Sequence, residues 1–352
     1  MMDHKREQGP LAMYCIVLLT LGILLGPGLL GTGVAFRPLG VPDPTTIEYP
    51  NDAPPSPAEI NLGKALFFDK RVSVNNKTSC ATCHDPNHGF SDGVSLGKGT
   101  MGNTLGRHTP HLYNLAWGSS FFWDGRAKSL EEQALGPIEA PGEMSMAVDK
   151  LVGKLKTIPF YVQSFEKVYP KSKITRENIG KAIAAFERTI VSNNSPFDRY
   201  MKGDKSALTQ EAVRGMQLFV GKAGCANCHD GPNFTDDSFH NIGLGGTDKG
   251  RAAIVHDETL LGAFKTPGLR NIALTAPYMH DGSLKTLKEV VHFYNEGGRH
   301  KQGISDLIKP LQLTESEMSD LVAFLVALTD PVKITPPAGI AREFVSSAKL
   351  AR

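Results

Sequence analysis

The sequence is poor in cysteine and in tryptophan, and its charges nearly cancel. It holds five cysteines and two tryptophans among 352 residues, with a formal net charge of +2. This balance gives no electrostatic footprint for nucleic acid, so no nucleic-acid partner is expected. Convincing runs of alternating polar and apolar residues are also missing, which argues against a domain built on β-sheet. A mostly α-helical fold is the expectation that remains.

Four of the five cysteines lie in two CxxCH motifs, Cys80-Ala81-Thr82-Cys83-His84 and Cys225-Ala226-Asn227-Cys228-His229. In this motif the two thiols bond to the vinyl groups of a haem, and the adjacent histidine binds its iron. Zinc or dithiol redox sites would explain the cysteine pairs but not the histidine after each pair. The sequence therefore predicts two covalently bound haem c groups.

Residues 1–36 have the layout of an export signal. Lys5 and Arg6 precede an apolar stretch from Leu11 to about Ala35, which contains Cys15 and ends in small residues suited to cleavage. The stretch is also long enough to remain as a membrane anchor, but its glycines and proline favour cleavage. Because haem c is attached outside the bacterial inner membrane, the folded domains are expected in the periplasm.

An internal repeat indicates a duplicated domain. At an offset of 157 residues, segment 109–116 matches 266–273, and Trp123-Asp124-Gly125 matches His280-Asp281-Gly282. We expect a proline-rich linker at 37–57, one haem c domain at 58–200, a second at 201–335 and a tail at 336–352.

Apolar periodicity predicts where the helices lie. The expected ranges are 58–68, 129–135, 147–165 with a break at Pro159, 176–191, 210–219 and 284–294. Thr314 and Glu317 form a capping box for one more helix with an apolar face.

Three segments beside the haem motifs resemble a known family. They are Leu66-Phe67-Phe68-Asp69, Phe122-Trp123-Asp124-Gly125-Arg126 and Pro277-Tyr278-Met279-His280-Asp281-Gly282. Together they resemble the bacterial di-haem cytochrome c peroxidase family, which includes MauG, over residues 56–330. The resemblance implies two cytochrome c-like domains, with the peroxide-reactive haem on His84 and the electron-transfer haem on His229.

The resemblance also assigns catalytic roles. It places Trp123 between the haems as a relay for electron holes, whereas a tryptophan at an arbitrary position would more often be a packed core residue. Gln133 and Glu143 match the spacing of the family's distal amide and acid. Glu143 would move a proton between the peroxide oxygens, and Glu139 is a nearby competitor for that role.

One departure from the family pattern concerns the first haem. Many members close this haem at rest with a histidine, and Lys98 occupies that position here. A protonated lysine is a poor iron ligand, so the first haem is expected to be open to peroxide. His88, His108 and His111 are the alternative ligands, although His88 follows His84 too closely to reach the opposite haem face easily.

The second departure concerns the other iron. The family pattern places a methionine 14 residues after His280, and the residue there is Tyr294. A phenolate stabilises high iron oxidation states, whereas methionine raises the reduction potential. Both departures are those of the MauG-like branch. The alternative ligands for this iron are Met279, His292 and Met318.

Calcium between the domains is a further property of the family. Thr275 and Pro277 match the positions of its carbonyl ligands, but His108 stands where an asparagine is expected. Imidazole suits calcium poorly, so the resemblance leaves this metal undecided.

The sequence thus predicts an enzyme that uses hydrogen peroxide to form high-valent iron. It would oxidise a protein partner or protein side chain through Trp123. The alternative is a cytochrome c peroxidase that reduces hydrogen peroxide to water with electrons from a small cytochrome c or cupredoxin. A non-catalytic electron carrier or haem sensor would leave Gln133 and Glu143 without a role.

Overall fold

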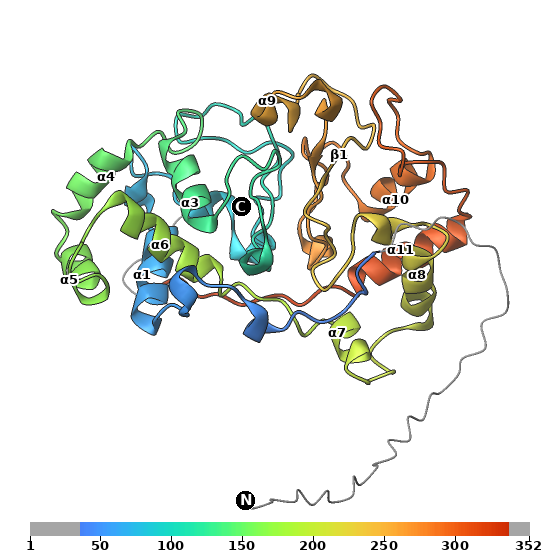
Figure 1. The fold of residues 1–352 in the computed structure, drawn as a ribbon, viewed down its shortest axis with the longest axis horizontal. Helices are drawn as coiled ribbons and strands as arrows, with labels where there is room; N and C mark the ends of the chain where they lie inside the picture. The colour runs from blue at the N-terminus through green and yellow to red at the C-terminus, as the bar shows by residue number, and fades with distance from the viewer. Residues whose placement is uncertain (1–35, 338–352) are drawn as a thin grey trace, which may run out of the picture. The chain divides into compact units, whose positions relative to one another are not determined.

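The computed structural model describes residues 36–337, so the predicted export segment lies outside the described residues except for Phe36. The α-helices are α1 (Pro57–Phe68), α2 (Cys80–Cys83), α3 (Leu130–Glu139), α4 (Val148–Leu155), α5 (Pro159–Val168), α6 (Arg176–Glu187), α7 (Pro196–Met201), α8 (Gln210–Val220), α9 (Ala252–Val255), α10 (Leu287–Asn295) and α11 (Glu315–Val326) (Figure 1).

Short elements complete the described part of the chain. The strands β1 (Phe239–His240) and β2 (Phe264–Lys265) pair antiparallel. The 3-10 turns are η1 (Pro44–Thr46), η2 (Pro50–Asp52), η3 (Lys70–Val72), η4 (Pro86–His88), η5 (Leu115–Trp117), η6 (Cys225–Asn227), η7 (Glu258–Leu260) and η8 (Ile272–Leu274). Within residues 36–337 no helix has the length and apolar character needed to cross a membrane.

Side-chain caps start the helices close to where the periodicity predicts. Ser56 accepts a hydrogen bond from the Glu59 backbone at the start of α1, and Thr209 caps α8 in the same way. The capping box of Thr314 and Glu317 is present at α11. Pro159 begins α5 at its first position, so the predicted 147–165 segment forms two helices.

Each haem domain is built around one close helix crossing. In the first domain α1 packs on α6, and a Cβ on Gly63 would lie 1.7 Å from the Ala182 carbonyl oxygen. In the second domain α8 packs on α11, and a Cβ on Gly215 would lie 1.9 Å from the Asp320 carbonyl oxygen. Only glycine allows the backbones to approach this closely, so the two domains use the same packing device.

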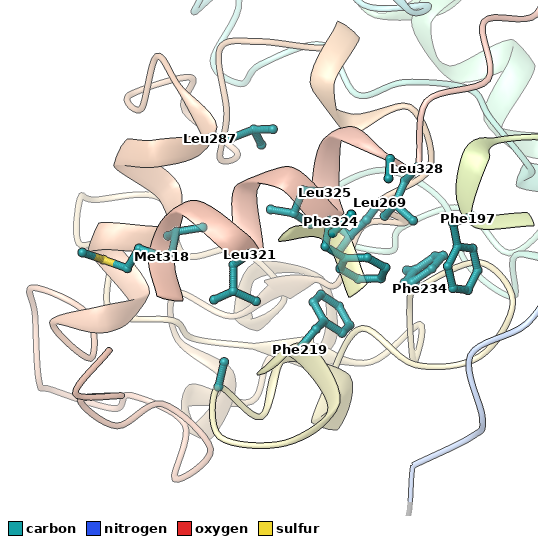
Figure 2. Close-up of a cluster of buried hydrophobic side chains, with 14 of the residues drawn as sticks. Phe197, Phe219, Phe234, Leu269, Leu287, Met318, Leu321, Phe324, Leu325 and Leu328 are labelled. Atoms are coloured by element: carbon teal, nitrogen blue, oxygen red, sulfur yellow. The ribbon is translucent and has the colours of Figure 1, made fainter. Parts of the chain in front are cut away.

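The core of the second domain is an aromatic cluster (Figure 2). Phe219 and Phe324 meet edge to face with ring centroids 5.2 Å apart, and Phe197 meets Phe234 in the same way at 5.3 Å. Such pairs add about 0.5–1.5 kcal/mol each beyond the burial of their area. This cluster fixes α8 and α11 beside the second haem motif.

The internal repeat is visible in the backbone. Asn114 (φ 59°) and Asn271 (φ 60°), 157 residues apart, both adopt the left-handed conformation before the turns η5 and η8. Isolated bridges Phe121–Ala127 and Tyr278–Leu284 follow at the same offset. The mostly α-helical fold with two cytochrome c-like domains, which the family resemblance implies and the repeat supports, is confirmed.

The proline-rich segment 37–57 contacts both haem domains. Arg37 pairs with Asp230 at 2.7 Å, and Trp117 donates its indole N–H to the Thr46 hydroxyl at 2.9 Å. After α11 the chain returns to the first domain, where Val332 packs on its core. The segments at both ends of the described chain therefore hold the two domains together.

Candidate active site

The first CxxCH motif forms the short helix α2. The Thr82 hydroxyl accepts a hydrogen bond of 2.9 Å from the Ser79 backbone, which begins the helix. Nδ1 of His84 lies 3.0 Å from the Phe90 carbonyl oxygen. This contact fixes the imidazole with its Nε2 free to bind a metal.

The second motif repeats this geometry. Nδ1 of His229 lies 2.9 Å from the Phe234 carbonyl oxygen, and Phe234 (φ 56°) adopts the left-handed backbone also seen at Phe90 (φ 60°). No disulfide joins the four motif cysteines, and burial raises the pKa of the Cys83 thiol to about 11. Paired thiols beside an oriented imidazole are the donor set that haem c requires, so both sites fit this cofactor.

The first motif opens on a cavity, here called the first cavity. Its chemically functional lining residues are Cys80, Cys83, His84, Lys98, Gln133, Glu143 and Glu187. The predicted amide and acid are therefore brought together beside the histidine of the first motif. Oε1 of Gln133 is buried and has no hydrogen-bond partner within the described residues. Burial raises the pKa of Glu143, although Arg126 acts in the opposite direction.

Glu139 lies outside the first cavity. Its carboxylate forms two hydrogen bonds of 2.6 Å with the guanidinium of Arg176, and both side chains are partly exposed. This pairing holds the pKa of Glu139 below its usual range. The competitor for the acid role is thus an ionised surface residue.

A loop brings Lys98 to the wall of the first cavity. The Thr100 backbone N–H donates to the Glu143 carbonyl at 2.7 Å. A Cβ on Gly99 would lie 1.8 Å from the Gly142 carbonyl oxygen, so glycine is needed for this approach. Lys98 itself is exposed. The loop that carries Lys98 is therefore held against the segment that carries Glu143.

The alternative histidines for the first iron lie elsewhere. The side chain of His88 is 60% exposed and pairs with Asp85. His108 and His111 line the cavity of the second motif instead. Nε2 of His111 lies 2.8 Å from the Gly268 carbonyl oxygen, and burial lowers its pKa to about 4. None of the three lines the first cavity.

The second motif opens on another cavity, here called the second cavity. Its lining includes Cys225, Cys228, His229, Trp123, Met279, His280 and Tyr294. Burial raises the pKa of the Tyr294 phenol, so its ionisation needs a nearby positive charge such as a metal. Met318 lies in the hydrophobic core (Figure 2), and the side chain of His292 is 52% exposed. Of the four candidates for the second ligand of this iron, opposite His229, Tyr294 and Met279 line this cavity.

Trp123 belongs to the first domain but reaches the second cavity. Its indole N–H donates to the His108 carbonyl at 2.8 Å. Its ring meets the His280 ring edge to face at 6.4 Å, and His280 stacks on Phe264 at 3.6 Å. The sequence repeat identifies His280, but nothing in the sequence predicts its stack with Phe264.

The predicted calcium residues also line the second cavity. Thr275 is buried, and Pro277 follows it in the same wall. The imidazole of His108 makes contacts of 3.0 Å with the Val94 carbonyl and 3.4 Å with the Ser91 hydroxyl. Because protein groups occupy both ring nitrogens, this side chain is not available to a metal as it stands. Calcium stays an undecided prediction.

Two titratable residues near the haem motifs, Glu187 and His240, are not predicted by the sequence. Glu187 lines the first cavity and is only 4% exposed. His240 pairs with Asp236 at 2.9 Å, and this hydrogen bond, together with Cys228, raises the pKa of His240 to about 10. Helical periodicity predicts the α6 segment, and a CxxCH search finds Cys228, but neither signal identifies which distant side chains share a cavity.

Comparisons with known proteins agree with this geometry. The family profile described as di-haem cytochrome c peroxidase matches residues 57–206, and that of cytochrome c matches residues 212–329. The methylamine utilization protein MauG of Methylorubrum extorquens is 46% identical over 299 residues, which cover 84% of this chain and 85% of that protein. The chain belongs to the di-haem cytochrome c peroxidase family, which includes MauG. The predicted resemblance is confirmed, and the protein is a di-haem peroxidase, an oxidoreductase that acts on peroxide.

Other family members are similar over most of their length. The cytochrome c551 peroxidase of Pseudomonas aeruginosa is 35% identical, with 82% of this chain and 83% of that protein covered. A crystal structure of a MauG-like protein associated with microbial copper homeostasis matches with a TM-score of 0.76 and 32% identity, covering 86% of this chain and 96% of that one. These peroxidase families imply haem c as the cofactor and a protein or cytochrome as the reaction partner.

Proposed function

We propose that this di-haem peroxidase works as MauG-like enzymes are expected to do, with hydrogen peroxide as oxidant and a protein or protein side chain as reductant. One observation carries the proposal. Gln133 and Glu143 line the same cavity as His84, and Oε1 of Gln133 has no protein partner in the described chain. A buried amide oxygen without a partner is costly unless a ligand or water supplies one. Peroxide in this cavity would do so.

The residues of the first cavity have different roles in the reaction with peroxide. His84 would bind the iron of a haem held by Cys80 and Cys83, and bound haem supplies a redox-active centre for electron transfer. Glu143 is the base that accepts a proton from one peroxide oxygen and returns it to the other. The Gln133 amide N–H groups orient the oxygen, while its Oε1 accepts a hydrogen bond. Lys98 replaces the closing histidine, which supports access of peroxide without prior reduction.

Trp123 connects the two halves of the reaction. Its backbone belongs to the domain of His84, while its ring lines the cavity of His229. An indole loses an electron more readily than other neutral side chains, so Trp123 can pass a hole between the two sites. Tyr294 as an anionic iron ligand would stabilise the oxidised second site. The reaction reduces one peroxide to two waters with two electrons and two protons.

The electron source and the location follow from the same proposal. A small cytochrome c, a cupredoxin or a protein substrate delivers the electrons. The predicted export signal and the haem c motifs support a location in the periplasm, either free or anchored to the inner membrane. The similarity to the methylamine utilization protein MauG of Methylorubrum extorquens supports the MauG-like proposal.

A second function is a cytochrome c peroxidase that detoxifies peroxide. It is favoured by the similarity to the cytochrome c551 peroxidase of Pseudomonas aeruginosa and by Met279 in the second cavity. Methionine ligation would raise the potential of the second haem and allow its reduction by a small cytochrome.

One experiment separates the two functions. Stoichiometric hydrogen peroxide is added to the diferric protein, and both ferric signals are followed by electron paramagnetic resonance. We expect both signals to disappear without prior reduction. A protein that reacts only after one haem has been reduced would contradict the MauG-like proposal and support the second function.

A further inference from the structure

Glu187 places an unpartnered carboxyl group in the wall of the first cavity. It is the last residue of α6, it is 4% exposed, and it lines the cavity together with Cys80 and His84. Its Oε2 is fully buried and has no hydrogen-bond partner among residues 36–337. A buried polar atom in this state needs a partner that the folded chain does not supply.

The surroundings of Glu187 disfavour its negative charge. Arg188 is the neighbouring cation, but its guanidinium contacts both carboxylate oxygens of Glu131 at 2.7 and 3.2 Å. Glu131 is itself a negative charge on α3, and the C-terminal end of α6 adds the negative end of a helix dipole. Burial raises the pKa of Glu187 to about 8 against the pull of Arg188. The carboxyl is therefore mostly neutral near pH 7.

The other titratable groups of the cavity do not compensate this charge. Cys80, the first residue of α2, would be a neutral thioether once haem is attached. His84, which follows α2, is held by its contact with the Phe90 carbonyl. From the loops, Glu143 adds a second acid, and Lys98 is an exposed cation with no hydrogen bond or ion pair to Glu187. A haem bound in this cavity would gain positive charge on oxidation, and this change would act on the carboxyl group of Glu187.

The proposed peroxide reaction has a need that Glu143 does not meet. Reducing one peroxide to two waters consumes two protons, but Glu143 only moves a proton from one oxygen to the other and supplies none. A neutral carboxylic acid in the same cavity can supply one, because a gain of positive charge nearby favours its ionised form. This step rests on the proposed function.

We propose that Glu187 stores a proton for the first haem site, releasing it when that site loses an electron and regaining it when the electron is restored. On release, the Glu187 O–H bond breaks and the proton passes to the peroxide oxygen that stays in the cavity, because the proton moved by Glu143 already completes the departing water. The two electrons that break the O–O bond come from the two haem sites, one from each. Bulk water supplies the second proton of the reaction. Bulk water returns the proton to Glu187 when the donor protein returns the electron.

The test uses the di-haem holoprotein without peroxide. The midpoint potential of each haem is measured by spectroelectrochemical titration between about pH 6 and 9, a range that brackets the raised pKa. For the first haem of the wild type we expect the potential to fall with rising pH, approaching one proton per electron. Glu187→Gln should flatten this dependence and leave the second haem unchanged. Glu139→Gln removes a carboxylate outside the cavity and should match the wild type.

Equal pH slopes in the wild type and in Glu187→Gln would overturn the proposal. An offset of the potential that is the same at every pH would also overturn it, because it would indicate a structural role. If Glu187→Gln does not fold, proton uptake on reduction of the wild type is measured with an indicator dye, and no uptake near pH 7 would reject the idea. A Glu187-dependent slope without any peroxide reaction would support proton storage but contradict the proposed function.

Discussion

Trp123 and His280 meet edge to face, with ring centroids 6.4 Å apart, although they come from different haem domains. They occupy the same position in the two halves of the sequence repeat. The His108 backbone joins them, because its carbonyl accepts from the Trp123 indole at 2.8 Å and its N–H donates to the His280 carbonyl at 2.7 Å. The duplicated turns thus meet at the junction and carry a redox-active ring from one domain into the cavity of the other.

Replacing Trp123 by Phe tests the relay. Phenylalanine keeps an aromatic ring but loses the hydrogen bond to His108 and is much harder to oxidise. We expect the response of the second haem to peroxide to slow by about tenfold or more, equivalent to a barrier raised by about 1.4 kcal/mol. Rapid-freeze electron paramagnetic resonance of the second ferric signal measures this rate.

The chain offers a matched control in its other tryptophan. Trp117 bonds to Thr46 through the same indole N–H but does not line either haem cavity. Trp117→Phe should leave the rate unchanged. Unchanged kinetics in Trp123→Phe would remove Trp123 from the reaction.

Arg270 is expected to be the most costly single charge to remove from the second domain. It is 1% exposed and bonds to fully buried Asp198 at 2.9 Å and to the Gly40 carbonyl at 3.0 Å. Arg270→Gln would leave Asp198 buried without its ion partner, which costs roughly 3–5 kcal/mol. Arg214 pairs with Asp320 from a half-exposed position, where water can replace the lost guanidinium, so Arg214→Gln should cost much less than Arg270→Gln. Denaturant unfolding followed by circular dichroism compares the two, and similar losses would contradict the expected dependence on burial.

Local signals predicted the helices of this fold well. Caps and periodicity operate within one or two turns, so Ser56, Thr209 and Thr314 mark helix starts without knowledge of the tertiary structure. The six residues of α7 are too few for a periodic pattern, and the two-residue strands β1 and β2 form only because distant loops meet. These elements were missed.

The candidate site was predictable only as far as motifs and family spacing reach. Spacing from Trp123 identified Gln133 and Glu143, which do share a cavity with His84. It could not separate Glu143 from Glu139, because the pairing of Glu139 with Arg176 joins residues 37 positions apart. It also gave no sign of Glu187, since an acid inside an amphipathic helix resembles a solvated one until the tertiary packing is known.

Tyr294→Met should change the chemistry of the second haem. If Tyr294 binds this iron, methionine in its place raises the reduction potential and favours the ferrous state. We expect the variant to need one reducing equivalent before it reacts with peroxide. A redox titration with optical detection measures the shift.

Two further variants identify the ligand. Tyr278 is another buried phenol of the second cavity, so Tyr278→Phe is the control and should leave the potential unchanged. Met279→Leu removes the competing ligand in the same wall. A spectrum that changes with Met279→Leu but not with Tyr294→Phe would assign the iron to Met279 and exclude Tyr294.

Glu143→Gln should abolish proton transfer while it preserves the shape of the first cavity. General acid–base catalysis contributes about 10²–10⁴-fold, and we expect the rate of the peroxide reaction to fall within this range. Only the ionised carboxylate can accept a proton, and burial raises its pKa above 4.5. The wild-type rate should therefore fall as the pH drops through this raised pKa, and this fall of the rate at acid pH should be missing in the variant.

Glu139→Gln is the control, because it loses only the pairing with Arg176 and Glu139 lies outside the cavity. This variant should keep both the rate and its acid limb, the fall of the rate at acid pH. Stopped-flow rates across this pH range decide the assignment, because an acid limb that moves with Glu139 instead would transfer the acid role to that residue.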